Sequence, residues 1–220
     1  MISELFLAVG GIRTMETVRT FESMSDEAIK KMLISAEQGY ARAQYNVALL
    51  YFYGKRGFEK DSAKGIYWYH QAAQNGNNHA AYDLGVCYYY GQGVEQDYTK
   101  AFQFLNQAAK NGHIRAMQLV GDAYAFGHGV ASDEAKAFEA YLSAALRNNY
   151  DAMVSLALCY QEGFGCEVDD GEAITWLEKA CEHQIPLAYY HLGLCYQEGR
   201  GVAKDEEKAK AYLEKAKPTF

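Results

Sequence analysis

The sequence predicts an all-α protein in which pairs of helices repeat along the chain and stack on one another. The first observation is a fixed period, because aspartates recur every 36 residues at Asp61, Asp97, Asp133, Asp169 and Asp205. A period of this length is typical of a stacked repeat array. The second observation is that each period holds two segments in which apolar residues recur at three- and four-residue spacing, as in amphipathic helices.

The first helix of a repeat is predicted from residues 80–90. Ala80, Leu84 and Tyr88 line one side of this helix, and Gly91 ends it, because glycine adopts the left-handed cap conformation without strain. Gly85 lies inside the helix, where glycine costs about 1 kcal/mol relative to alanine. A residue this small predicts that another helix crosses closely there. The other repeats place equally small residues at this position, namely Ala48, Gly121, Ala157 and Gly193.

A glycine turn and a second helix follow. The carboxylate of Asp97 is placed to accept hydrogen bonds from the free amides that open this helix. The apolar side of the second helix consists of Ala101, Phe104, Leu105 and Ala108. A phosphate-binding loop would need a strand before the glycines and a Lys-Ser/Thr pair after them, and the sequence has neither. The Gly-x-Gly and Asp residues are therefore interpreted as the turn and cap of a helical hairpin.

Composition and charge exclude several classes of function. The net charge is −7 and the Lys and Arg residues do not cluster, so no nucleic-acid partner is expected. No apolar run approaches the ~20 residues of a membrane span. Residues 1–24 are interpreted as an N-terminal helix or cap, because Glu4 and the absence of basic residues before the apolar stretch do not fit a signal peptide. A cytoplasmic location is expected, although a chain that had lost an export signal would look the same.

No catalytic, cofactor-binding or metal-binding residues are predicted. The five cysteines are an odd number, and Cys87, Cys159 and Cys195 share one position that other repeats fill with Ala123 or Leu50. This exchange indicates small buried side chains. The histidines show no ligand spacing, and the acidic segment CEVDDGE does not match an EF-hand.

Residues 80–112, AAYDLGVCYYYGQGVEQDYTKAFQFLNQAAKNG, resemble the Sel1-like repeat, a relative of the tetratricopeptide repeat. A half repeat at 25–42 precedes five repeats, at 43–79, 80–115, 116–151, 152–187 and 188–217. The resemblance implies a right-handed α/α solenoid of antiparallel helix pairs and a non-catalytic adaptor role. One departure from the pattern is in the fourth repeat, where Glu172 stands at the position that is Lys in the pattern.

A protein or peptide is the expected partner, bound on the concave face that the resemblance assigns to the first helices. The side chains predicted to contact it are aromatic in the early repeats and more acidic in the later ones, which favours a partner with apolar anchors and basic residues. Packing of the same aromatics between repeats is the open alternative. We refer to the predicted residues as the first-helix surface: Tyr45, Phe52, Tyr53, Tyr82, Tyr89, Tyr90, Gln118, Asp122, Phe126, Glu162, Tyr190 and Glu198.

Two other functions stay open. A cysteine-rich branch of the family resembled is linked to β-lactam binding and weak hydrolysis, and it pairs its cysteines regularly. Here Ala188 stands where a partner for Cys181 would be expected, and no Ser-x-x-Lys motif is present. The other is a self-assembling structural protein. Its contacts would come from the N-terminal segment, which carries apolar residues at helical spacing, namely Ile2, Leu5, Phe6, Val9 and Ile12.

Overall fold

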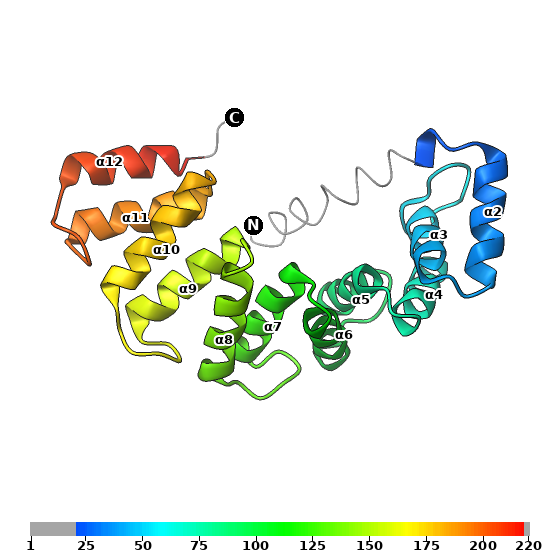
Figure 1. Ribbon diagram of the computed structural model, residues 1–220, viewed down its shortest axis with the longest axis horizontal. Coiled ribbons are helices and arrows are strands. Elements are labelled where there is room, and N and C mark those ends of the chain that lie inside the picture. Colours follow the sequence, from blue (N-terminus) through cyan, green and yellow to red (C-terminus); the bar gives the residue numbers. More distant parts are fainter. Residues whose placement is uncertain (1–20, 218–220) are drawn as a thin grey trace. The chain divides into compact units, whose positions relative to one another are not determined.

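The computed structural model describes residues 21–217, and the regular secondary structure in this range is α-helical (Figure 1). The described residues divide into two compact units, residues 21–107 and 108–217. The five apolar residues that suggested self-assembly, and most of the expected N-terminal cap, lie outside the described residues.

In the first unit, consecutive helices pack against one another from α2 to α5, and α6 lies against α5 at Gly85 and Leu105. After α2, each repeat contributes a first helix and a second helix, and α6 contains the boundary between the two units. The helices are α2 (Asp26–Glu37), α3 (Ala41–Tyr53), α4 (Ser62–Gln74), α5 (Asn78–Tyr90) and α6 (Tyr98–Lys110).

The second unit continues the same alternation, and again each helix packs on the next along the chain. The all-α class and the pairing of helices are therefore as predicted from the repeat. The helices are α7 (Ile114–Phe126), α8 (Glu134–Ala145), α9 (Tyr150–Glu162), α10 (Asp170–Glu182), α11 (Pro186–Glu198) and α12 (Glu206–Lys215).

The periodic aspartates cap the second helices, which confirms the prediction. Asp97 Oδ1 accepts a hydrogen bond from the backbone N–H of Lys100, 2.9 Å away, at the start of α6. The other four caps make the same bond at 2.9–3.1 Å, namely Asp61, Asp133, Asp169 and Asp205. Each carboxylate therefore satisfies an amide that the helix leaves without a partner.

The Gly-x-Gly turns end the first helices in the expected way. Gly91 closes α5 with a left-handed φ of 69°, and the second glycine, Gly93, has a φ of 73°. A Cβ atom on Gly93 would lie 2.7 Å from Cβ of Ser62, which begins the second helix of the preceding repeat. The second glycine is therefore required by a close approach between neighbouring repeats as well as by its backbone conformation.

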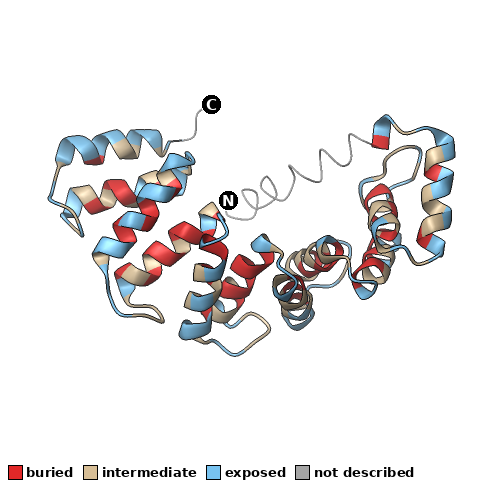
Figure 2. Cartoon of the chain, viewed as in Figure 1, coloured by how far each residue is buried: buried red, intermediate tan, exposed pale blue. Residues whose placement is uncertain are grey.

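The first and second helices of a repeat cross closely at the small residue, as predicted. A Cβ on Gly85 would lie 2.7 Å from Leu105 Cγ, and a Cβ on Gly121 would lie 2.6 Å from the ring of Tyr141. Buried and exposed residues alternate along the helices, as expected of amphipathic helices (Figure 2). The predicted burial of Cys87, Cys159 and Cys195 is also found.

Two second helices end at residues other than glycine that nevertheless adopt the left-handed conformation. Asn148 has a φ of 62° and Gln184 has a φ of 59°, where the earlier repeats place Gly76 and Gly112. Asparagine tolerates this region, whereas the longer side chain of glutamine is strained there. The end of α10 is therefore less favourable than the other helix ends.

Candidate protein-interaction surface

Tyr45, on α3, is an internal link between two first helices. Its hydroxyl donates a hydrogen bond to Asp83 Oδ2 on α5, 2.9 Å away, and its ring centroid lies 5.9 Å from that of Tyr69. Burial, and then the negative charge of Asp83, raise the pKa of Tyr45 well above its ordinary value. The phenol therefore keeps its proton and holds α3 to α5.

The next two aromatics of α3 differ in their exposure. Phe52 is half-buried and lies against Gly65 of α4, where an added Cβ would be 2.9 Å from Phe52 Cβ. Tyr53 packs edge-on against Phe52 with ring centroids 5.3 Å apart, and 43% of its surface remains exposed. Tyr53 is therefore supported by its neighbour and remains partly exposed to solvent.

Tyr82, Tyr89 and Tyr90, on α5, are all partly buried. Tyr89 makes edge contacts with Tyr90 at 4.9 Å and with Tyr98 at 5.1 Å. Gln96 donates from Nε2 to the carbonyl of Tyr89 at 2.7 Å and lies 3.1 Å from the hydroxyl of Tyr98. An aromatic cluster thus covers the end of α5 and the loop after it.

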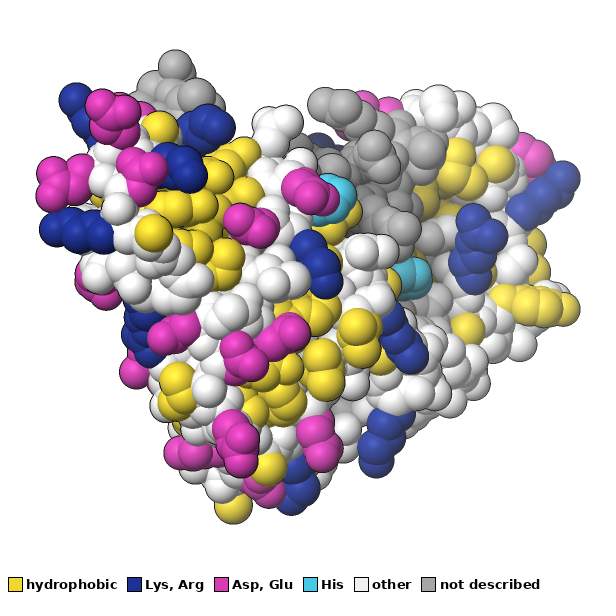
Figure 3. All heavy atoms as spheres, turned by 60° about the vertical axis from the view of Figure 1, so that its left-hand side comes forward, with side chains coloured by type: hydrophobic (Ala, Val, Ile, Leu, Met, Phe, Trp, Pro, Cys, Tyr) yellow, Lys and Arg dark blue, Asp and Glu magenta, His cyan; other side chains and the backbone are white. Residues whose placement is uncertain are grey.

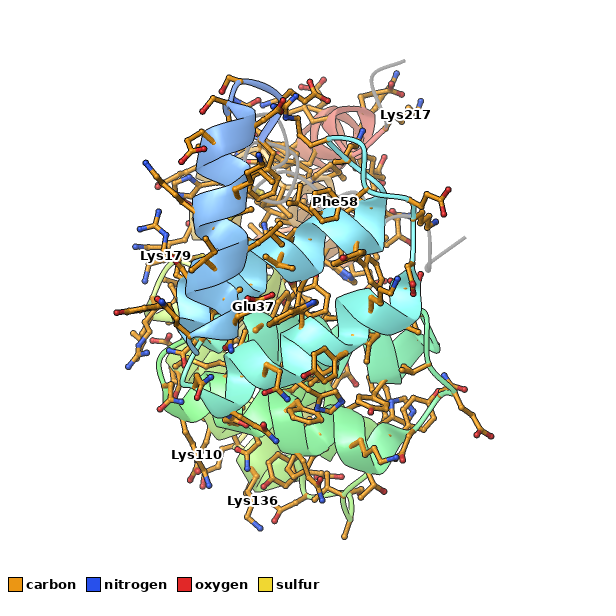
Figure 4. All side chains as sticks on the ribbon, turned by 90° about the vertical axis from the view of Figure 1, so that its right-hand side faces the viewer. Glu37, Phe58, Lys110, Lys136, Lys179 and Lys217 are labelled. Carbon is orange, nitrogen blue, oxygen red and sulfur yellow. The ribbon has the colours of Figure 1, made fainter. Side chains whose placement is uncertain are left out.

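Figure 4 shows the described side chains with α2, α3 and α4 toward the viewer, and Phe58 lies in the α3–α4 loop.

Gln118, the first predicted contact residue in the second unit, is buried, with 8% of its surface exposed. Asn149 donates from Nδ2 to Gln118 Oε1 at 3.4 Å, and its own Oδ1 caps α9 by accepting from the backbone N–H of Ala152. Gln118 therefore positions the start of the following repeat, and it is the least accessible member of the first-helix surface in this unit.

Asp122 is a carboxylate in a position that is apolar in the other repeats. Its Oδ1 accepts a hydrogen bond from the hydroxyl of Tyr141 at 2.8 Å. Burial raises the pKa of Asp122 to about 6, the Tyr141 bond opposes that rise, and the charge of Asp151 adds to it. The other repeats place at this position Leu49, Val86, Leu158 and Leu194.

The remaining predicted residues of the second unit lie at the surface. Phe126 is 69% exposed and Tyr190 is 45% exposed. Glu198 is exposed, and so is Glu162, whose Oε1 lies 3.0 Å from Nη1 of Arg200. On the face of this unit turned forward in Figure 3, acidic side chains lie close to hydrophobic ones.

Arg200 is a polar residue that the sequence pattern did not single out. Besides Glu162, it contacts Asp170 Oδ1 through Nε at 2.8 Å and donates to the carbonyl of Gln161. It occupies the middle of the last Gly-x-Gly turn, so this turn is fastened to the preceding repeat. A basic residue in a turn that the second, third and fourth repeats fill with Gln92, His128 and Phe164 was the available signal.

The described part of the chain lacks a cluster of metal ligands. Within residues 21–217, no group of three or more His, Cys, Asp and Glu side chains is placed to hold a metal ion. No helix in that range has the length and apolar character needed to cross a membrane. All five cysteines are free thiols, and burial raises the pKa of Cys181 to about 12, so this thiol stays protonated near neutral pH.

The profile of the Sel1 repeat matches the chain five times, at residues 41–77, 78–113, 114–149, 151–184 and 186–217. The chain belongs to the Sel1 repeat family. Two curated relatives of this Sel1 chain come from Arabidopsis thaliana, the ERAD-associated E3 ubiquitin-protein ligase components HRD3B and HRD3A. Identity is 30% over 94 residues of HRD3B and 31% over 76 residues of HRD3A, covering 43% and 34% of this chain. The matches span only 14% and 11% of those relatives.

Solved structures confirm the repeat fold. A protective antigen of uropathogenic Escherichia coli with an SLR fold matches 86% of this chain and 40% of its own, with 33% identity and a TM-score of 0.79. A Sel1 repeat protein from Oxalobacter formigenes matches 87% of this chain and 76% of its own, with 32% identity and a TM-score of 0.74. The Sel1 chain therefore has the α/α solenoid fold of helix pairs that the sequence predicted.

Proposed function

We propose that this Sel1 repeat chain is a non-catalytic scaffold that binds a peptide or protein segment along its first-helix surface. Sel1 repeat proteins typically mediate protein–protein interactions. Both curated relatives are named as components of a ubiquitin ligase, which fits a role within a larger assembly.

One observation carries the proposal, namely the last residue of each first helix. This position is aromatic at Tyr53, Tyr90 and Phe126, and it is acidic at Glu162 and Glu198. Because it directly precedes the glycine cap, the fold does not require an apolar side chain there. Exposed aromatic side chains next to polar ones are typical of binding surfaces.

The exposed aromatics favour a particular partner chemistry on each unit. On the first unit, Tyr53 offers a ring face and a hydroxyl, which suit an apolar side chain with a nearby polar group. On the second unit, the exposed Phe126 shares its helix position with Glu162 and Glu198, which favour Lys or Arg. The partner segment is therefore expected to combine apolar anchors with basic residues.

The test begins with selection of peptides from a random display library on the wild-type protein, followed by calorimetry on the selected peptides. Selected peptides should combine apolar and basic residues. The Tyr53→Ala/Phe126→Ala double variant should bind them at least about tenfold more weakly, since buried aromatic anchors dominate such interfaces. Because both rings are exposed, the melting temperature should change little.

Tyr67→Ala is the matched control, because Tyr67 is 56% exposed but lies on α4, a second helix. This variant should bind the peptides as the wild type does. Equal binding by the double variant and the wild type would contradict the proposal, as would loss of binding in the Tyr67→Ala control alone.

A further inference from the structure

Four of the five repeats share a small cation site at the start of the second helix. In the second repeat, Lys100 Nζ lies 3.2 Å from Oδ2 of the cap residue Asp97 and 5.3 Å from the ring centroid of Tyr88, on the preceding helix. We call this arrangement the Asp–Lys–Tyr triad. The other three triads are Asp61–Lys64–Tyr51, Asp133–Lys136–Tyr124 and Asp205–Lys208–Tyr196.

The geometry of the triad hardly varies among these four copies. The ammonium nitrogen lies 5.1–5.5 Å from the tyrosine ring centroid and 2.6–3.8 Å from the aspartate oxygen. A cation over an aromatic face and beside a carboxylate gains from both groups. The turn and the tyrosine thus form a site for an ammonium group, which the chain fills with its own lysine.

The fourth repeat keeps the frame of this site and lacks the lysine. The backbone N–H of Asp169 donates to the carbonyl of Tyr160 at 2.9 Å, as the cap residues of the other repeats do to their tyrosines at 2.8–3.0 Å. Asp169 Oδ1 still accepts from the backbone N–H three residues later, at 2.9 Å. That residue is Glu172, so the fourth repeat has a second carboxylate where the other repeats have the lysine.

No other cation of the described chain replaces the missing lysine. Among residues 21–217, neither Asp169 nor Glu172 forms an ion pair, and no Lys or Arg lies over the ring of Tyr160. The lysine of the same helix, Lys179, instead lies over Trp176 at 4.1 Å.

The ring of Tyr160 contacts Phe138 and lies near two carboxylates. Phe138 meets Tyr160 edge to face, with centroids 5.3 Å apart and planes at 89°. Burial raises the pKa of Tyr160, and the negative charges of Glu172 and Asp169 add to the rise. These two carboxylates are therefore close enough to act on the phenol.

We propose that the turn of the fourth repeat binds a lysine side chain of a protein partner, with its ammonium group at Tyr160, Asp169 and Glu172. The four filled triads are the independent observation that identifies the ligand, because the same backbone frame holds an ammonium group in each of them. The contact extends the proposed scaffold function to a loop outside the first-helix surface, and either can fail without the other.

The partner lysine gains two acidic neighbours where each internal lysine has one cap residue. A single exposed contact of this kind is weak, so an isolated lysine should bind only at millimolar concentration. Within a partner that already contacts the scaffold elsewhere, the same contact should strengthen binding by about tenfold. The site is therefore expected to select among partners rather than to recruit one alone.

The test follows the tyrosine ring signals of ring-¹³C-tyrosine protein by NMR at low ionic strength. The probe is an acetylated and amidated peptide with one lysine between glycines, and the control peptide carries norleucine instead. A Tyr160→Phe variant assigns the Tyr160 signal. Saturable movement of that signal with the lysine peptide, and none with the norleucine peptide, is the expected result.

Two substitutions sharpen the test. Glu172→Lys supplies the missing internal ammonium group and should abolish the movement of the Tyr160 signal. Glu139→Lys changes the net charge equally at an exposed position on α8 and should leave the movement unchanged. Circular dichroism confirms that both variants are folded.

Three results would overturn the proposal. The first is an equal response to the norleucine peptide, and the second is no saturable movement of Tyr160 across the titration. The third is that Glu139→Lys suppresses the response as strongly as Glu172→Lys, which would show a general effect of charge. Because the probe does not require the first-helix surface, these results leave the proposed scaffold function to its own experiment.

Discussion

Asp122 should make the native state more stable at mildly acidic pH than at neutral pH. Its pKa is about 6 in the folded protein, against an ordinary value of 3.8, because burial disfavours the charged form. Between these two pH values the native state binds the proton more tightly than the unfolded state does. The stabilisation is therefore complete below pH 3.8 and is lost as the pH rises through about 6.

The magnitude follows from the size of the shift. About two pKa units correspond to about 3 kcal/mol of unfolding free energy between the two limits. Asp122→Asn removes the charge but keeps an oxygen that can accept from the Tyr141 hydroxyl. The variant should match the wild type near pH 4 and exceed its stability by about 3 kcal/mol at pH 7.5.

Urea denaturation followed by circular dichroism, at intervals from pH 4 to pH 8, measures this difference. Other titrating groups largely cancel, because they are common to both proteins. Glu139→Gln, at an exposed position, is the control and should show no such change with pH. A stability difference between Asp122→Asn and the wild type that stayed constant with pH would refute the reasoning. It would mean that the Tyr141 hydroxyl holds the carboxylate at its ordinary pKa.

Three further predictions concern the repeat frame and are checked by chemical denaturation. Gly85→Ala should lower the unfolding free energy by about 1–3 kcal/mol, because the new Cβ would lie 2.7 Å from Leu105 Cγ; an unchanged value would show that the helices separate easily. Gln184→Gly should raise it by about 0.5–1 kcal/mol by relieving the left-handed φ of 59°, and a loss would argue against strain. Arg200→Gln should lower it by about 1 kcal/mol by removing the half-buried ion pair with Asp170, and a loss that did not shrink in high salt would point to packing instead.

The repeat frame could be predicted from the sequence because its residues act over a few positions. Asp97 caps the helix that it precedes, and Gly91 ends the helix that it follows. The prediction from Gly85 reached further, to a crossing helix. Glycine weakens the interior of a helix, so it is expected there only where a close neighbour leaves no room for a Cβ atom. Five copies in phase made each local inference stronger than a single copy would.

The contacts of the first-helix surface could be predicted only in part. The spacing of residues placed Tyr45 and Asp122 on the outward side of their helices, but it did not reveal that both form hydrogen bonds within the protein, to Asp83 and Tyr141. Helical periodicity gives the direction of a side chain from its own axis. It does not show which long side chain of a neighbouring helix reaches it.

The departures from the repeat indicate where this chain is adapted to a task other than folding. Asp122 introduces a carboxylate where the sister repeats have an aliphatic residue, and at neutral pH that charge opposes folding. Glu172 stands in place of the triad lysine, so the fourth repeat lacks the ion pair and the cation–π contact that the four sister repeats have. Both substitutions lie in the second unit, and both should reduce stability. Positions where one copy of a repeat departs from the stabilising choice are those at which binding is expected to have determined the residue.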